Sequence, residues 1–226
     1  MLGLVAARVI AQAAAKSDLL ARIDHIVYAT PDLNAGIDAI EKLTGVRATP
    51  GGQHPGRGTR NALIALGPTS YLEIIGPDPE QPAPPSPRPF GIDGLKAPRL
   101  ARWVVKAQNL EQLAAEASRK GIQLGKVTGG KRQRPDGVLL TWRYTDPLVD
   151  LADGLVPFFI DWGDSPHPAT TAAKGLTLIA LRGEHPDAAR VGKILMQLGL
   201  DLPVKTGSAP ALIATIDSPR GRVDLR

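Results

Sequence analysis

The chain contains no cysteine among its 226 residues. This absence excludes disulfides, thiolate metal ligands and a cysteine nucleophile. No apolar run approaches the roughly 18 residues that a membrane-spanning helix requires. Aromatic residues make up only 4% of the chain, and they do not interleave with its one short basic cluster, residues 131–134. A nucleic-acid surface needs a denser basic stripe with stacking rings, so we expect no nucleic-acid partner. We also expect no membrane partner and a cytoplasmic location.

The composition is that of a globular protein. Apolar residues make up 43% of the chain and charged residues 22%, and the formal net charge of +5 suits attraction for small anions. Residues 1–22 are rich in alanine, and we expect them to form an N-terminal helical extension. No basic segment precedes their apolar stretch and Arg8 interrupts it, which favours a docked helix over a cleaved signal peptide.

The strongest information in the sequence is internal repetition. In residues 23–76, a β-branched strand is followed by Pro31-Asp32, which opens a helix with apolar residues at helical spacing. A turn-rich segment and two further strands follow, so the unit has the order βαβββ. The expected strands are residues 23–30, 61–66 and 71–75, and the helix runs from Leu33 to Leu43 and ends at Gly45.

The same order recurs twice. In residues 100–162 we expect strands at 100–106, 138–144 and 157–162 and a helix from residue 110 to 117. A shorter copy occupies residues 175–226, with strands at 176–181, 211–216 and 222–225 and a helix over 186–198. The proline-rich segment 77–99 cannot join a sheet or a helix, so it must cross the surface as an extended strap. We therefore expect residues 23–168 to form one domain of two paired units, followed by a third unit.

Aligning the copies places His25 opposite Arg102. Glu73 falls opposite Asp161 and, with weaker support, Asp224. Each final strand thus carries an acid flanked by apolar residues. Since side chains alternate along a strand, that acid points to one face and its neighbours to the other.

The first candidate site is formed by His25, His54 and Glu73. Two imidazoles and a carboxylate suit a divalent ion such as zinc, nickel, manganese or iron, with positions left open for a substrate. In a curled sheet, His25 on the first strand and Glu73 on the last strand of one unit would project into the same concavity. The alternative is structural: His25 is a buried histidine bonded to Asp24 or paired with Glu73.

The second candidate is the glycine-rich segment of residues 51–61. Its backbone N–H groups and the guanidinium groups of Arg57 and Arg60 suit a carboxylate or phosphate of a ligand, and Asn61 ends the segment. The spacing does not match a P-loop or a dinucleotide-binding fingerprint. The alternative is a flexible hairpin with solvated arginines.

The third candidate is Asp161, which stands among aromatic residues that include Trp162. A carboxyl group in such surroundings can have a raised pKa and act as a general acid or base. The alternative is an ion pair with Arg102 or Arg143. His167 and His185 each precede a proline and are expected to shape turns.

Several of these segments together resemble the glyoxalase-like domain family of the vicinal-oxygen-chelate superfamily. The resemblance covers residues 23–168 and is carried by residues 24–29, 31–33, 51–61, 71–75, 89–93 and 158–162. It implies an α+β fold in which tandem βαβββ modules form a cupped mixed sheet, as in glyoxalases and dioxygenases. It also implies a divalent metal that binds two adjacent substrate oxygens, with His25 and Glu73 at ligand positions and His54 as the loop histidine.

The second module departs from the metal pattern, because Arg102 stands where a ligand would be. This leaves either a reduced His/Glu metal site or an arginine-lined anion pocket without metal. We expect a metal-dependent lyase or isomerase acting on a small substrate with vicinal oxygens. Glu73 and Asp161 are the expected catalytic residues, and the expected substrate-binding residues are Arg57, Arg60, Asn61, Arg102 and Trp162.

Two other functions and an assembly state also follow from the resemblance and the repeats. The same cup without metal would sequester a small compound, as the antibiotic-binding relatives of the superfamily do, and iron would give an extradiol-type dioxygenase. The third unit would leave a sheet edge unpaired, so we expect a homodimer.

Overall fold

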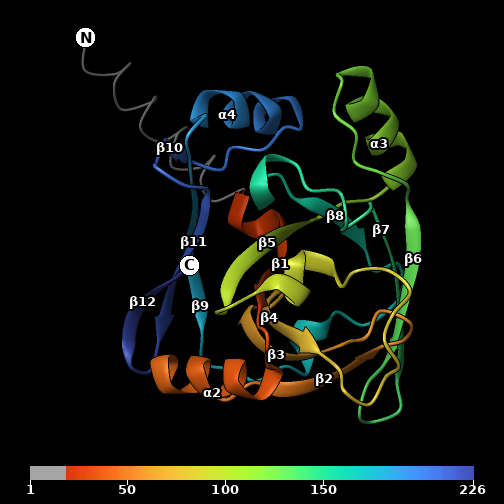
Figure 1. The fold of residues 1–226 in the computed structure, drawn as a ribbon, viewed down its shortest axis with the longest axis vertical. Coiled ribbons are helices and arrows are strands. Elements are labelled where there is room, and N and C mark those ends of the chain that lie inside the picture. The colour runs from red at the N-terminus through yellow and green to blue at the C-terminus, as the bar shows by residue number, and fades with distance from the viewer. Residues whose placement is uncertain (1–18) are drawn as a thin grey trace.

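The computed structural model describes residues 19–226 and contains two β-sheets (Figure 1). The larger has eight strands in the order β2-β3-β4-β1-β5-β8-β7-β6 and is strongly curved. Its strands are β1 (Ile23–Ala29), β2 (Thr49–His54), β3 (Thr59–Gly67), β4 (Ser70–Pro77), β5 (Arg99–Lys106), β6 (Thr128–Gln133), β7 (Leu139–Tyr144) and β8 (Phe158–Asp161). The predicted α+β architecture with a cupped mixed sheet is confirmed.

The first half of this sheet is formed by β1 to β4 with helix α2 (Leu33–Thr44). Asp32 caps the helix by accepting a hydrogen bond from the Ala35 amide at 3.0 Å, and Gly45 ends it in the left-handed conformation at φ 80°. β1 runs parallel to its neighbour β4. The segment expected to be only turns, residues 49–58, instead forms β2 and a tight connection to β3.

The second half repeats this arrangement with β5 to β8 and helix α3 (Leu110–Arg119). β5 runs parallel to β8, and the antiparallel pairing of β1 with β5 joins the two halves at the centre of the sheet. β6 is a strand that the sequence pattern missed. Each half curls away from the central pair, so the sheet encloses a concave face.

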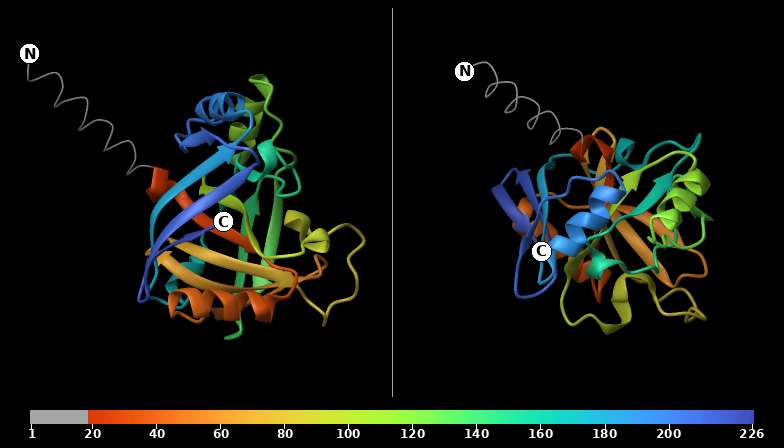
Figure 2. Two further views of the ribbon diagram at one scale, coloured as in Figure 1. Left: turned by 60° about the vertical axis from the view of Figure 1, so that its left-hand side comes forward. Right: turned by 90° about the horizontal axis from the view of Figure 1, so that it is seen from above.

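A second sheet follows, in the order β10-β9-β11-β12. It is formed by β9 (Thr177–His185), β10 (Val204–Thr206), β11 (Ala211–Ser218) and β12 (Gly221–Leu225), with helix α4 (Ala188–Gln197) beside it. Figure 2 shows it lying along one side of the curved sheet. Leu178, Leu181 and Ile216 belong to the same buried cluster as Ile23 and Ile26 of β1, so one apolar core spans both sheets.

The proline-rich strap runs over the mouth of the concave face. Arg88 anchors it by donating through Nε to the Gly58 carbonyl at 2.7 Å and by pairing with Asp93 at 2.6 Å. A short 3₁₀ segment, η1 (Pro89–Gly94), follows, and its Phe90 has a positive φ of 63°. The strap therefore brings an aromatic ring to the concavity instead of only linking the two halves.

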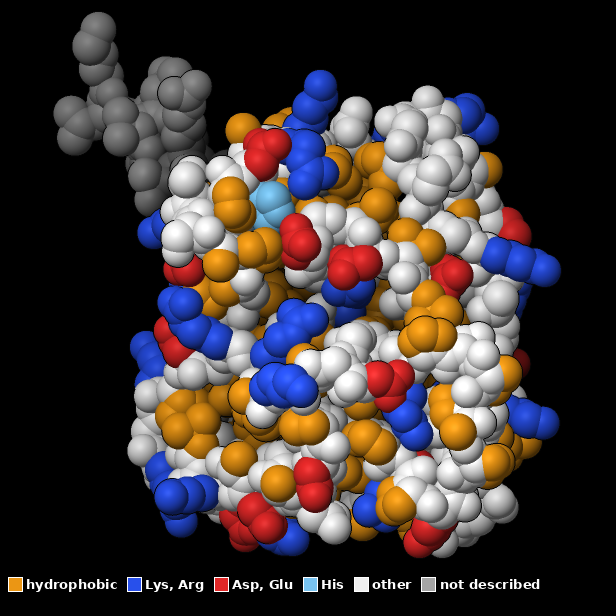
Figure 3. All heavy atoms as spheres, viewed as in Figure 1, with side chains coloured by type: hydrophobic (Ala, Val, Ile, Leu, Met, Phe, Trp, Pro, Cys, Tyr) orange, Lys and Arg blue, Asp and Glu red, His pale blue; other side chains and the backbone are white. Residues whose placement is uncertain are grey.

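The predicted helical extension lies mostly outside the described residues, which begin at residue 19; residues 19–22 are helical. Among the helices of residues 19–226, none combines the length and apolar character needed to cross a membrane. The face of the molecule seen in Figure 3 carries acidic and basic side chains interspersed, so it presents no broad field of a single sign.

Candidate functional site

The concave face of the large sheet holds a cavity of about 300 Å³. Both halves of the sheet contribute to its walls, and the strap covers part of its rim. The first half and the strap supply His25, His54, Arg57, Asn61, Tyr71, Glu73 and Phe90, and the second half supplies Lys131, Arg132, Trp142, Tyr144, Phe158 and Trp162.

Two histidines converge on one carboxylate at this cavity. Nε2 of His25 lies 3.8 Å from Oε2 of Glu73, and Nε2 of His54 lies 3.9 Å from Oε1 of the same group. The strand order explains the meeting of His25 and Glu73, because β1 and β4 are direct neighbours. His54 arrives from β2, at the turn into β3. The structure therefore brings together the three residues proposed as metal ligands.

Behind His25 lies a fully buried carboxylate, Asp24. A β-bulge between Ile23 and His25 lets this residue approach its neighbour's ring, and Oδ1 of Asp24 is 2.7 Å from Nδ1 of His25. The other oxygen is 3.1 Å from both His167 Nε2 and Trp162 Nε1. The expected pairing of His25 with Asp24 is thus present together with its approach to Glu73.

The contacts of Asp24 fix its charge and the orientation of His25. Burial alone would raise the pKa of Asp24, but hydrogen bonds from His167 and His25 outweigh it and lower the pKa to about 2. An ionised carboxylate accepts the Nδ1 proton of His25 and so fixes the orientation of the ring, with Nε2 toward Glu73. This is the arrangement by which a carboxylate orients a metal-binding or proton-accepting histidine.

His54 is held in a similar way by neutral partners. Its Nδ1 is 3.0 Å from Thr59 Oγ1, and its Nε2 is 3.3 Å from the Asn61 amide nitrogen, which also donates to Glu73 at 2.6 Å. Burial, opposed by the charge of Glu73, lowers the pKa of His54 to about 4. His54 is therefore neutral at pH 7, with Nε2 as a hydrogen-bond acceptor.

Two neutral imidazole nitrogens and a carboxylate form a donor set whose chemistry fits a divalent ion. The side chains of residues 19–226, as they stand, include no group of three or more His, Cys, Asp or Glu that surrounds an ion position. Instead, the Asn61 amide holds Glu73 and lies next to His54. The amide oxygen of Asn61 is buried without any hydrogen-bond partner and faces the backbone of Gly51, so it is the amide nitrogen that this residue directs at the two proposed ligands.

The cavity also has cationic side chains. Arg57 is predicted as a site residue from the sequence, and Arg132 is not. Arg57 donates to the Tyr144 hydroxyl at 3.1 Å. Arg132, on β6, is buried and donates to the Gly51 carbonyl. The sequence shows Arg132 only as part of a basic cluster. It does not predict Arg132 in the site, because residues 128–133 do not have a strand-like pattern.

Aromatic rings form the apolar wall. Trp142 and Trp162 lie with centroids 5.1 Å apart, and Phe158 lies 6.3 Å from Phe90 and 6.4 Å from Tyr144. Tyr71 stacks on His25 at 4.6 Å. Only Trp162 among these rings had been proposed as a binding residue. Tyr71, Trp142, Tyr144 and Phe158 stand in strands that the sequence predicts, and the alternation of inward and outward positions along those strands is the signal that could have pointed to them, whereas Phe90 stands in η1.

Three predicted residues do not reach the cavity. Asp161 lies between Ile160 and Trp162, which both point inward, so alternation along the strand turns its carboxylate away, where it accepts from the Gly163 amide at 2.9 Å. It pairs with neither expected arginine, because Arg143 pairs with Glu111. The alignment of Asp161 with Glu73 is therefore out by one residue.

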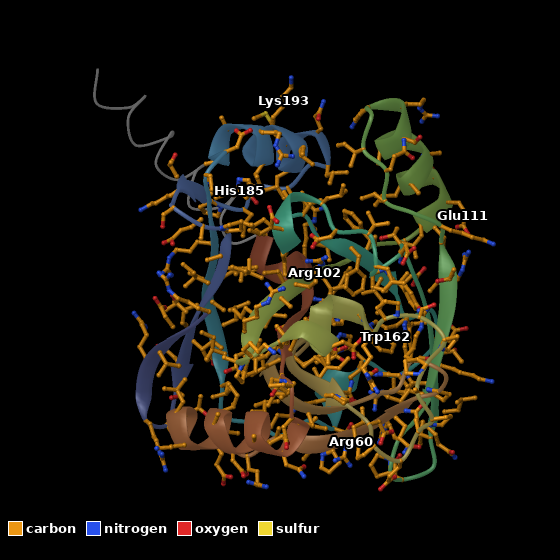
Figure 4. All side chains as sticks on the ribbon, in the orientation of Figure 1. Arg60, Arg102, Glu111, Trp162, His185 and Lys193 are labelled. Atoms are coloured by element: carbon orange, nitrogen blue, oxygen red, sulfur yellow. The ribbon has the colours of Figure 1, made fainter. Side chains whose placement is uncertain are left out.

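The two arginines are turned away for separate reasons. Arg60 lies between Thr59 and Asn61, which line the cavity, and so faces the opposite side of β3. Arg102 is buried, with Nη2 3.0 Å from Asp150 and Nη1 3.0 Å from the Ala101 carbonyl. In Figure 4, Arg60 and Arg102 lie well apart. His167 and His185 each accept a hydrogen bond from a backbone amide two residues on, as expected of turn-forming residues.

Comparisons with known proteins concern the fold and the family of this chain. No protein with a curated description matches the chain. A hypothetical protein from Staphylococcus aureus has a similar structure, with a TM-score of 0.60 and 13% identity over 89% of this chain and 83% of that one. At that identity the likeness concerns the fold alone.

Methylmalonyl-CoA epimerases superimpose less well. The enzyme from Mycobacterium tuberculosis has a TM-score of 0.41 and 16% identity over 68% of this chain and 94% of its own. The one from Streptomyces coelicolor has a TM-score of 0.42 and 19% identity over 65% and 98%. The sequence model of the glyoxalase-like domain family matches residues 23–199, which confirms the predicted resemblance, and the chain therefore belongs to the glyoxalase-like domain family.

Proposed function

We propose that this protein is a divalent-metal-dependent lyase or isomerase acting on a small substrate with adjacent oxygens. The observation that carries the proposal is the convergence of His25 and His54 on Glu73 at a cavity with aromatic walls. His25, His54 and Glu73 would hold the ion. When bound, such an ion would polarise the substrate oxygens as a Lewis acid.

The residues of the chain have separable roles in this proposal. Glu73 takes a proton from the carbon next to a substrate carbonyl; the electron pair of the broken C–H bond forms a C=C bond, and the π pair of the carbonyl moves to its oxygen. Return of the proton to the opposite face of the same carbon inverts that carbon, and its return to the former carbonyl carbon, with loss of the proton of the neighbouring hydroxyl, moves the carbonyl. Asp24 keeps the Nε2 lone pair of His25 directed at the reacting group, and the aromatic wall and strap exclude water from it.

The test is metal content by elemental mass spectrometry on protein purified without chelator. We expect close to one metal per chain in the wild type and a loss of most of it in Glu73→Ala. Asp161→Ala is the matched control, because it removes an acid from the corresponding strand of the second half but lies outside the cavity, and we expect it to keep its metal. A Glu73→Ala protein that binds as much metal as the wild type contradicts the proposal.

The identity of the metal refines the reaction. Zinc, nickel or manganese supports lyase or isomerase chemistry, and iron supports an extradiol-type dioxygenase. The second candidate is a metal-free binding protein, and one observation favours it: the Asn61 amide already satisfies Glu73 without a cation. A wild type that takes up no divalent ion on incubation would favour this candidate.

The proposal extends to assembly. The second sheet ends in β12, which pairs with β11 on one side only. A homodimer would cover such an edge. Light scattering at micromolar concentration tests it, and a monomeric mass contradicts it.

A further inference from the structure

A buried guanidinium without a counter-charge stands in the cavity. Arg132 is only 3% exposed and lines the cavity wall. Within residues 19–226, it has no acidic group within 4.0 Å, although every other arginine as deeply buried, namely Arg102, is paired with an aspartate. Its one protein hydrogen bond goes to the Gly51 carbonyl. Since a guanidinium has five N–H donors, most of its capacity is unused by the described residues.

Such a group is costly to bury. Removing a charge from water without a partner is unfavourable, and burial lowers the pKa of Arg132, against the more distant attraction of Glu73. An anion from solution that reaches the guanidinium would remove this penalty. Planar bidentate pairing makes a carboxylate the natural match for an arginine in this position.

The cavity as a whole carries more positive than negative side chains. Three cationic side chains line it, Arg57, Lys131 and Arg132, against the single carboxylate of Glu73. Arg57 and Lys131 are exposed and lie toward solvent, whereas Arg132 is deep. An anion would thus be attracted at the rim and held further in.

The walls between these charges are flat and apolar. Trp142, Trp162 and Phe158 provide ring faces and edges on the second half of the sheet, and Tyr71 stacks on His25 on the first half. Offset or edge-on packing of a ligand ring on such side chains is favourable beyond the area it buries. The space of about 300 Å³ suits a ligand with one ring and a short acidic side chain.

We propose that the substrate is a small aromatic carboxylic acid, with its carboxylate paired to Arg132, its ring against the Trp142–Phe158 wall, and an oxygen adjacent to the carboxylate directed to the His25–Glu73 pair. This assignment rests on the proposed function for the reaction. Binding to Arg132 and the wall requires neither a metal nor turnover.

The test compares mandelate with mandelamide, which share the ring and the adjacent hydroxyl but differ in charge. Binding is followed by quenching of tryptophan fluorescence, because Trp142 and Trp162 line the cavity, and by titration calorimetry, with chelator present throughout. We expect the wild type to bind mandelate at least tenfold more tightly than mandelamide. Arg132→Met should abolish that preference, and Arg132→Lys should leave part of it.

Arg143→Met is the matched control, since it removes the same charge from the neighbouring strand but Arg143 is exposed and paired with Glu111. It should keep the wild-type preference. Circular dichroism and thermal melting check that Arg132→Met is folded, and Arg132→Lys carries the test if it is not. Equal binding of the two probes by the wild type, an unchanged preference in Arg132→Met, or a failure of mandelate, benzoate and cinnamate alike to bind would overturn the proposal.

The two proposals fail in different experiments. If the wild type contains no metal, the proposed reaction is contradicted. The proposed anion binding is not, because the binding assay contains chelator throughout. Loss of the mandelate preference with metal still bound removes the substrate class and leaves the metal-dependent reaction in place.

Discussion

The two halves of the large sheet have the same topology and contribute opposite chemistry. In each, the first strand runs parallel to the last, β1 with β4 and β5 with β8, and the halves meet at the β1–β5 pair. The first half provides the imidazoles and the carboxylate. The second half provides Lys131, Arg132 and most of the aromatic wall. In the proposed function the first half is the reacting side and the second half is the recognition side.

The two halves differ in which residues of their last strand face the cavity. On β4 the inward positions are Tyr71, Glu73 and Ile75, so the acid faces the cavity. In the second half the inward positions are Phe158, Ile160 and Trp162, and Asp161 falls between them. A shift of one residue exchanges the two faces of a strand, and here it exchanges an acid for a row of apolar side chains. The second half therefore retains an acid in its sequence but presents none to the cavity.

The largest expected effect comes from the buried carboxylate behind the reacting side. Asp24→Asn leaves one acceptor oxygen where His25, His167 and Trp162 all present nitrogens. Because breaking a fully buried charged network leaves groups unpaired, we expect the free energy of unfolding to fall by about 3–5 kcal/mol. Urea denaturation at pH 7 measures it.

The matched control for this change is Glu111→Gln on the recognition side. Glu111 and its partner Arg143 are both more than half exposed, so water screens their pairing and it should contribute little to the free energy of unfolding. If Asp24→Asn costs no more than Glu111→Gln, Asp24 does not organise the reacting side.

The next effect is a pH dependence that belongs to the first half. The pKa of His54 is about 4 in the folded protein against 6.5 for the free side chain. Between these values the unfolded chain binds the proton and the folded one does not, so stability falls as pH decreases from 6.5 toward 4. The loss amounts to at most about 3 kcal/mol, because each pKa unit corresponds to roughly 1.4 kcal/mol.

His54→Gln should flatten this part of the curve in chemical denaturation between pH 7 and 4. Asp24 does not interfere, because its lowered pKa keeps its contribution present above about 3.8, and that contribution is lost only as pH falls toward 2. A wild type and a variant with the same slope between pH 6.5 and 4 would show that His54 is not the group responsible.

How much the sequence predicted also differs between the halves. The first half was predicted in outline, with β1, α2, β3 and β4 close to their observed bounds, because their apolar residues follow simple periods. His25, His54 and Glu73 were identified from residue type, from the strand positions of His25 and Glu73 and from the family resemblance; His25 meets Glu73 because β1 and β4 are neighbours, and His54 comes from the end of β2. The contact of His25 with Asp24 was among the alternatives, but the contacts of Asp24 with Trp162 and His167 were not predicted, since these residues lie more than 100 positions away in the sequence.

The second half was harder to predict, because its Arg132 stands in a segment whose sequence has no strand-like pattern. β6 consists of Thr128-Gly129-Gly130-Lys131-Arg132-Gln133, with two glycines and no apolar residue, so neither strand nor burial could be expected of Arg132. Burial of Arg132 follows from the neighbouring strands: β6 pairs with β7, and the cavity lies on their shared inner face. Sequence patterns do not predict that a cationic side chain will be buried without an acidic partner.

The glycines of β6 provide the last and smallest test. A Cβ added at Gly130 would lie 2.6 Å from ring carbon Cζ2 of Trp142, whereas one at Gly129 would have its nearest neighbour at an ordinary 3.7 Å. Gly130→Ala should therefore push the Trp142 ring from the wall and destabilise the protein by about 1–3 kcal/mol. Gly129→Ala, one residue away in the same strand, should change stability by less than about 1 kcal/mol.

The fluorescence of Trp142 separates a change in the wall from a general loss of stability. A moved ring should shift the emission of Gly130→Ala under native conditions and weaken binding of mandelate and mandelamide in parallel, because the ring contact is shared by both probes while Arg132 is unchanged. If Gly130→Ala instead lowers the preference for the acid and leaves mandelamide binding intact, then Gly130 serves to position Arg132, and the recognition side depends on its backbone more than on its aromatic rings.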